Sequence, residues 1–279
     1  MESMREYWAR EAEMMRDKSA VLGNNSLSQS PSRNEQNTVK GTITFANEFN
    51  GSVGAELVAI ASTTSFYKDY VTQLEKQSAY DTYVFTYPAM FTYPTGNGKP
   101  ASTLYFDNKG FITGEGTRGR TILLTDENDY KQQTGPIGDP SNSYILQRVK
   151  LASIKSSFDN KKKVIMVVIA NQFLEPEAYP LKKEDLENLK KKTPLTEYNQ
   201  WWDNVKLDGT HTLLHELIAH GLNHIKNEKK TEEAEHKAYH GNATHRSPSI
   251  PEILKASSQY ANTLMYKVAQ ELKTEIKKR

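Results

Sequence analysis

Four of the seven histidines in this chain fall within one short segment, together with a glutamate. The segment reads His211-Thr-Leu-Leu-His215-Glu216-Leu-Ile-Ala-His220-Gly-Leu-Asn-His224. Neutral imidazole is the commonest protein ligand for zinc, and a glutamate directly after a ligand histidine can reach a metal-bound water without binding the metal. The segment therefore predicts a catalytic zinc site and a hydrolytic reaction.

The run His-Glu-Leu-Ile-Ala-His, from His215 to His220, resembles the H-E-x-x-H signature of zincin-type zinc metallopeptidases. In that signature the two histidines bind zinc and the glutamate is the general base. The longer H-E-x-x-x-H spacing found here is similar to that of metallopeptidase domains in bacterial toxins and secreted effectors. The resemblance implies a peptidase in which His215 and His220 bind zinc and Glu216 is the catalytic base.

The spacing of the two histidines departs from the signature, because five residues separate them instead of four. In a regular α-helix, five residues turn the second side chain roughly 140° past the first, too far for both to bind one ion. A π-bulge, with one i→i+5 turn, would restore a shared face, and Gly221 makes such a deformation less costly. We therefore predict a π-bulge near Ala219.

A regular α-helix would give different ligands. Glu216, His220 and His224 would then form an i, i+4, i+8 stripe that could bind zinc without a separate base. His211 and His215, one turn apart, are a second possible pair. The histidines could also form a polar helix face that binds no metal.

A catalytic zinc site needs a third protein ligand and an open position for water. Residues 230–240 have a helical composition and follow a short polar connection. In zincins with a glutamate as third ligand, that residue lies on a second helix, and by this resemblance Glu235 is the predicted ligand. The other candidates are His236, Glu232 and His224. Tyr239 or His240 could hydrogen-bond the developing oxyanion, as a tyrosine or histidine does in several zincins.

The region before the metal segment is rich in predicted strands. Strands are expected over residues 39–45, 80–93, 104–106, 111–113, 121–124 and 163–170. Residues 55–61 are a short apolar run in this region, 65–77 have helical spacing, and 107–110 carry a hairpin turn signal. The run 163–170 is the most hydrophobic and predicts a buried central strand.

The order of these elements predicts an α+β, zincin-like domain over residues 39–279. A mixed sheet would be followed by the active-site helix, a second ligand helix and a long C-terminal helix over residues 253–278. Residues 1–20 have the spacing of an amphipathic helix, and residues 21–38 have the polar composition of a flexible linker. We therefore predict an N-terminal helix and linker (1–38) and one metallopeptidase domain (39–279).

Composition narrows the possible partners. The 36 basic and 34 acidic residues nearly balance, which gives no indication of a nucleic-acid partner. The absence of cysteine excludes disulfides and thiolate ligands. The sequence contains no apolar run long enough to span a membrane, and its charged N-terminus lacks the apolar core of a signal peptide. We expect a cytoplasmic protein or one exported by a non-classical route.

Together these features predict a zinc-dependent peptidase that acts on a protein or peptide, in the manner of a bacterial toxin or effector. Two alternatives are a non-enzymatic binding module and a metal-dependent hydrolase of a non-peptide amide. The binding module would either bind a structural metal through His211, His215, His220 and His224 or bind no metal. Neither the oligomeric state nor the substrate sequence is specified by these patterns.

Overall fold

The computed structural model describes residues 40–87, 105–107, 109–113, 118–135, 140–175, 195–226, 231–241, 250–255 and 259–278. Internal contacts divide the chain into two units, Met1–Thr38 and Val39–Arg279. The predicted N-terminal helix and linker lie outside the described residues. The following description concerns the second unit.

A four-stranded mixed sheet organises the second unit, with strand order β1-β2-β6-β5. The strands are β1 (Ile43–Phe45), β2 (Tyr80–Tyr87), β5 (Gly119–Leu124) and β6 (Lys163–Ala170). β1, β2 and β6 run parallel, and β5 pairs antiparallel with β6. The predicted mixed sheet and α+β class are confirmed, and β5 is the edge strand beside β6.

β6 is a central strand of this sheet, and its sequence, Lys-Val-Ile-Met-Val-Val-Ile-Ala, explains why. A strand covered on both faces reads as a continuous apolar run instead of an alternating one. Every residue of β6 after Lys163 is buried. The predicted central strand at 163–170 is therefore confirmed with the same bounds.

In the described residues, helices occur both between the strands of the sheet and after them in the sequence. They are α2 (Ser52–Thr63), α3 (Ser65–Lys76), α4 (Glu127–Thr134), α5 (Pro140–Leu146), α6 (Lys155–Asp159), α8 (Leu195–His215), α9 (Leu222–Ile225), α10 (Glu232–His240), α11 (Ile250–Ile253) and α12 (Leu264–Lys277), with a π-helix, η4 (Glu216–Gly221), between α8 and α9. Three short 3₁₀ helices are η1 (Asn47–Asn50), η2 (Leu151–Ser153) and η3 (Asn171–Phe173). Among the described helices, none is long and apolar enough to cross a membrane.

The structure assigns one segment that the sequence left open and corrects the start of one predicted helix. The apolar run 55–61 lies in helix α2, where Leu57, Ile60 and Ala61 are buried at helical spacing. The C-terminal helix begins at Leu264 instead of residue 253, because the Thr263 side chain caps it by accepting a hydrogen bond from the Tyr266 amide. Residues 250–253 form the separate short helix α11.

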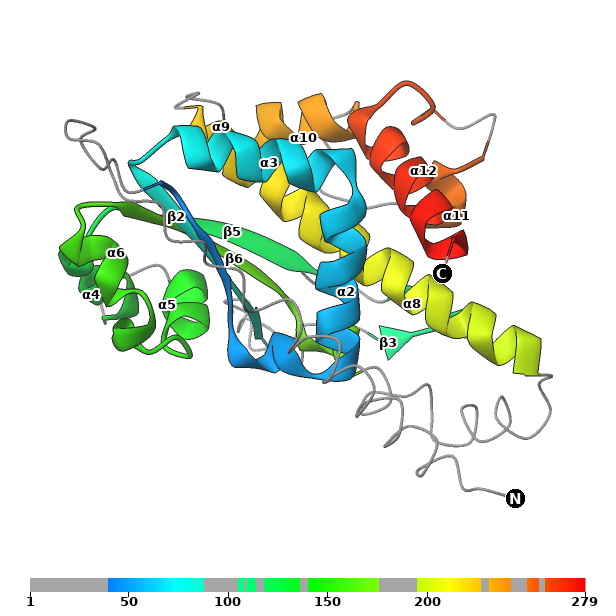
Figure 1. The fold of residues 1–279 in the computed structure, drawn as a ribbon, viewed down its shortest axis with the longest axis horizontal. Helices are drawn as coiled ribbons and strands as arrows, with labels where there is room; N and C mark the ends of the chain where they lie inside the picture. The colour runs from blue at the N-terminus through cyan, green and yellow to red at the C-terminus, as the bar shows by residue number, and fades with distance from the viewer. Residues whose placement is uncertain are drawn as a thin grey trace, which may run out of the picture. The chain divides into compact units, whose positions relative to one another are not determined.

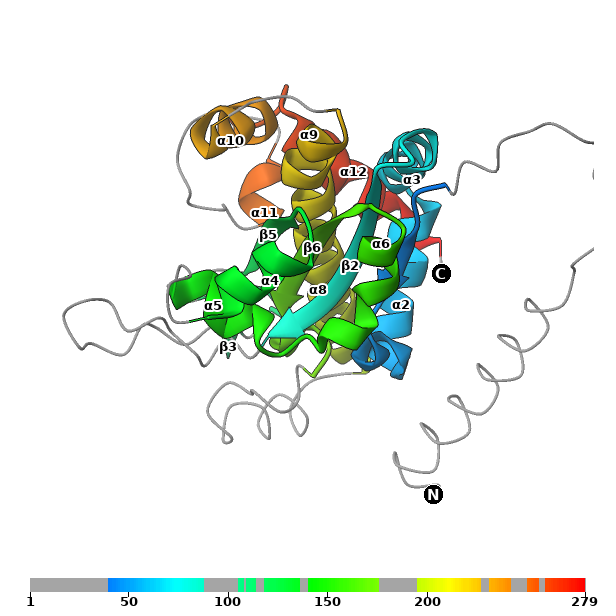
Figure 2. The same ribbon diagram turned by 90° about the vertical axis from the view of Figure 1, so that its left-hand side faces the viewer.

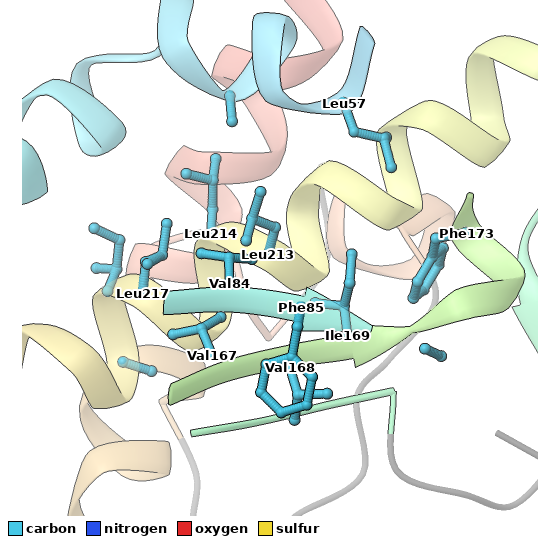
Figure 3. Close-up of a cluster of buried hydrophobic side chains, with 14 of the residues drawn as sticks. Leu57, Val84, Phe85, Val167, Val168, Ile169, Phe173, Leu213, Leu214 and Leu217 are labelled. Atoms are coloured by element: carbon cyan, nitrogen blue, oxygen red, sulfur yellow. The ribbon is translucent and has the colours of Figure 1, made fainter. Parts of the chain in front are cut away.

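The sheet lies between two groups of helices (Figures 1 and 2). Helix α8 crosses one face, and α4, α5 and α6 lie on the opposite side. Figure 3 shows the core under α8, where Leu213 and Leu214 meet Val84, Val167 and Ile169 of the sheet, while Phe85 and Val168 point to the other face. This packing fixes the end of α8 above β6.

A short hairpin attaches the start of β5 to α8. It pairs β3 (Tyr105–Phe106) with β4 (Ile112–Thr113), as predicted around residues 107–110. The carboxylate of Asp208 on α8 accepts a hydrogen bond from the Ile112 amide at 2.8 Å and lies 3.4 Å from the Arg118 guanidinium. Because Arg118 directly precedes β5, these contacts set the position of β5 against α8.

A buried ion pair joins the chain at or just before the starts of three strands. The Lys162 Nζ lies 2.9 Å from the Asp81 carboxylate, with side chains only 4% and 12% exposed. Asp81 also accepts hydrogen bonds from the backbone amide and hydroxyl of Thr42, and Lys162 donates to the Lys40 carbonyl. The pair therefore holds the chain before β1 to the starts of β2 and β6.

We predict that Asp81→Ala lowers the free energy of unfolding by about 3–5 kcal/mol, because it leaves the Lys162 ammonium buried without its counter-charge. Urea titration followed by circular dichroism measures this change. Lys155→Ala is the matched control, since its ion pair with Asp159 is exposed and its loss should cost much less stability. Equal losses for the two variants would contradict the assignment.

Candidate metal centre

The metal segment changes helix type at its centre. Helix α8 ends at His215, and Glu216–Gly221 forms a π-helix in which the Leu222 amide bonds to the Leu217 carbonyl, an i→i+5 bond. The predicted departure from α geometry near Ala219 is confirmed. As a result, the rings of His215 and His220 lie with their centroids 5.1 Å apart.

Side chains from neighbouring elements compensate for this irregular turn. The Asn223 amide donates to the Ala219 carbonyl, and the Thr121 hydroxyl lies 3.1 Å from the Glu216 carbonyl. At Gly221, an added Cβ would lie 3.1 Å from the ring of Tyr70 on α3, so a glycine lets that ring pack closely. Such contacts stabilise backbone groups that a π-turn leaves poorly paired.

Three histidines converge at the π-turn. His215, His220 and His236 each offer a ring nitrogen, and these atoms lie within 4.8 Å of one another. His236 comes from α10, and its ring centroid is 5.6 Å from that of His215 and 5.1 Å from that of His220. Three neutral imidazoles are a donor set suited to Zn²⁺ and several other transition metals, so this group could hold a metal ion.

Two further side chains orient the rings. The Nδ1 of His220 lies 2.6 Å from the Glu235 carboxylate, and the Nδ1 of His215 lies 3.3 Å from Nε2 of His240. Hydrogen bonds at Nδ1 leave Nε2 of both rings available to a metal. The Nε2 of His215 is also the nitrogen near Glu216, at 3.9 Å from its Oε1.

The ionisation of these groups suits metal binding. Burial lowers the pKa of His211 to about 3 and, with the neighbouring histidines, lowers the pKa of His215 far below its usual value. His215 is therefore neutral at neutral pH, the form that binds a metal. Burial raises the pKa of Glu235, but hydrogen bonds and charges from its neighbours, His220 first, leave it lower than usual and the group ionised.

The structure brings together three predicted site residues, His215, Glu216 and His220. It groups His236 with the two histidines, whereas Glu235, the predicted third ligand, contacts the outer nitrogen of His220. Glu235 and His236 lie differently because adjacent side chains of an α-helix point about 100° apart. Glu235 contacts Nδ1 of His220, and the ring of His236 lies beside the rings of both other histidines.

The other candidates lie outside this group. His211 and His224 do not belong to it, and the side chain of Glu232 is not among those described. Tyr239 is buried with its ring centroid 4.7 Å from that of His215. Its hydroxyl has no hydrogen-bond partner among the described residues, and burial, with the nearby Glu216, raises its pKa.

The sequence of α10 does not separate His236 from Glu235. The buried residues of this helix are Glu235, His236, Tyr239 and His240, whereas Glu233 and Lys237 are exposed. An i, i+1, i+4, i+5 pattern marks one helix face. Because Glu235 and His236 both lie on this face, the pattern alone does not say which of them joins the other two histidines.

No protein-family model matches the chain, and neither the curated proteins nor the solved structures contain a match to it. The resemblance to zincins thus depends on the motif, and the candidate centre depends on its own geometry.

We predict that deleting Ala219 preserves zinc binding. The deletion removes the extra residue of the π-turn, so a regular α-helix would place the two histidines one turn apart. Titration of zinc against a chromophoric chelator measures the affinity. A folded Ala219 deletion that binds no zinc would contradict the register argument.

We also predict that His236→Ala weakens zinc binding more than Glu235→Gln does. Loss of an outer-shell partner typically costs about 10–100-fold in affinity, and loss of a ligand should exceed this. His224→Ala is the control, since His224 lies outside the group, and its affinity should equal that of the unmodified protein. A greater loss of zinc affinity from Glu235→Gln than from His236→Ala would indicate that Glu235 is a zinc ligand.

Proposed function

We propose that this protein is a zinc-dependent peptidase, with His215, His220 and His236 as ligands and Glu216 as general base. The observation that carries the proposal is the convergence of nitrogens from two buried histidines, His220 and His236, and the half-buried His215, with the carboxylate of Glu216 beside them. Zinc held by three protein ligands with an open position lowers the pKa of a bound water toward neutrality.

Glu216 is suited to move the proton. Its carboxylate is buried and lies on the Nε2 side of His215, where an attacking water would be. In the proposed reaction Glu216 would accept a proton from the water as its oxygen bonds to the scissile carbonyl carbon, and would deliver that proton to the amide nitrogen as the C–N bond breaks. The carboxylate is thereby regenerated.

The position of β5 favours a peptide as substrate. β5 is one of the two edge strands of the sheet in the described residues, and it contacts Glu216 through Thr121. Extended peptides commonly bind by adding a strand to such an edge. A peptide bound along β5 would have its backbone carbonyls close to Glu216. An edge strand beside the active-site helix is the arrangement expected of a zincin-like peptidase.

The alternative of a structural metal is less well supported. A closed structural site has four protein ligands. The set His211, His215, His220 and His224 is not grouped in the described part of the chain, and the group found there offers three ligands, one fewer than a closed site. The toxin or effector role stays a prediction from the motif.

We predict that Glu216→Gln leaves zinc affinity unchanged and reduces peptide hydrolysis by about 10²–10⁴-fold, the usual contribution of a general base. Mass spectrometry of a proteome-derived peptide library incubated with zinc-loaded protein measures cleavage. Glu48→Gln, which changes a glutamate paired with Thr86 on β2, is the matched control and should retain activity.

Two outcomes would contradict the proposal. Hydrolysis that survives Glu216→Gln would exclude Glu216 as the base. Absence of cleavage by the unmodified protein, combined with unfolding on chelation, would indicate a structural metal.

A further inference from the structure

Two residues of β5 border the carboxylate of Glu216. The Thr121 hydroxyl donates to Oε2 of Glu216 at 2.8 Å and also lies 3.1 Å from its backbone carbonyl. A Cβ added to Gly119 would lie 2.8 Å from both Cγ and Oε1 of Glu216. One residue therefore holds the carboxylate, and the other leaves space for it.

Thr121 fixes which carboxylate oxygen does the chemistry. Its hydroxyl binds Oε2, while Oε1 is the oxygen near Nε2 of His215, at 3.9 Å. A glutamate side chain has considerable rotamer freedom, which must be restricted before it can work as a positioned base. The threonine supplies that restriction from outside the helix that carries Glu216.

Gly119 is required for space and not for its backbone conformation. Among the described glycines, the positive φ angles belong to Gly110 and Gly241. Any side chain at position 119 would occupy the volume of the Glu216 carboxylate. Because the atoms it would meet belong to a flexible side chain, the expected response is displacement of Glu216 with the fold retained.

The strand that carries both residues is itself anchored to α8. Arg118, directly before Gly119, reaches Asp208 on α8 and the Ile112 carbonyl. Asp208 is two helical turns before Glu216, so the strand and the base share one support. The contacts between β5 and Glu216 thus join elements that are held together independently of the site.

We infer that Gly119 and Thr121 are positioning residues that hold Glu216 in its reactive orientation. This inference rests on the proposed function of Glu216 as general base. It assigns to β5 a role in catalysis through Glu216, separate from any contact between the strand and a substrate.

Gly119→Ala, Thr121→Val and Thr121→Ser test the inference, with Thr86→Val as the matched control. Thr86→Val also removes a threonine-to-glutamate hydrogen bond from the same sheet, but at Glu48. We expect Gly119→Ala and Thr121→Val to lower kcat about 10²-fold, the typical effect of misplacing a catalytic group by about 1 Å. KM and zinc affinity should not change, and Thr121→Ser should recover most of the activity because it keeps the hydroxyl.

Crystal structures of the zinc-free variants measure the position of the Glu216 carboxylate without depending on catalytic activity. The Glu216 carboxylate should be displaced in Gly119→Ala and Thr121→Val but not in Thr121→Ser. An unmoved carboxylate in the first two variants, or unchanged kcat in both, would overturn the inference. If the unmodified protein cleaves no peptide, the proposed function fails. The position of the Glu216 carboxylate in the variant structures still shows whether Gly119 and Thr121 hold it in place. If Thr121→Val does not fold, Gly119→Ala and Thr121→Ser decide it.

Discussion

The candidate centre depends on one extra residue in the helical turn from Glu216 to Gly221. A regular helix would turn the His215 and His220 side chains to different directions. The π-turn instead brings both rings, with Glu216, to one side, where α10 adds His236. The irregular turn lies between helices α8 and α9, and all of its residues are buried, in contact with β5 and β6, so surrounding packing maintains it.

Neighbouring residues hold side chains of the centre in position before a metal or substrate binds. Glu235 and His240 contact the outer nitrogens of two of the three rings, and Thr121 binds one oxygen of Glu216. Ordering these side chains costs conformational entropy, and the folded protein meets that cost through contacts with α10 and β5. Such preorganisation is the usual requirement of a metal site with an open position.

Local sequence features predicted the parts of the fold that local physics determines. The apolar run of β6, the helical spacing of α3 and the turn between β3 and β4 all gave correct elements. The five-residue spacing also led correctly to the π-turn, because only that geometry lets His215 and His220 share an ion.

Features that depend on the packing of distant segments could not be predicted in this way. Whether Glu235 or His236 faces the other rings is set by how α10 is rotated against η4, and these residues are adjacent in the sequence. The contacts of Gly119 and Thr121 with Glu216 join positions far apart in the chain. No pattern within β5 indicates them, since a glycine and a threonine in a strand have many ordinary roles.

The central claim is that three histidines hold one zinc ion while Glu216 stays outside its coordination shell. A crystal structure of the zinc-loaded protein, with anomalous scattering measured at the zinc edge, tests this claim most directly. The account predicts bonds of about 2.0–2.1 Å from zinc to nitrogens of His215, His220 and His236, with the remaining position taken by water. Direct coordination by Glu216, or a zinc ion bound away from these three histidines, would contradict it.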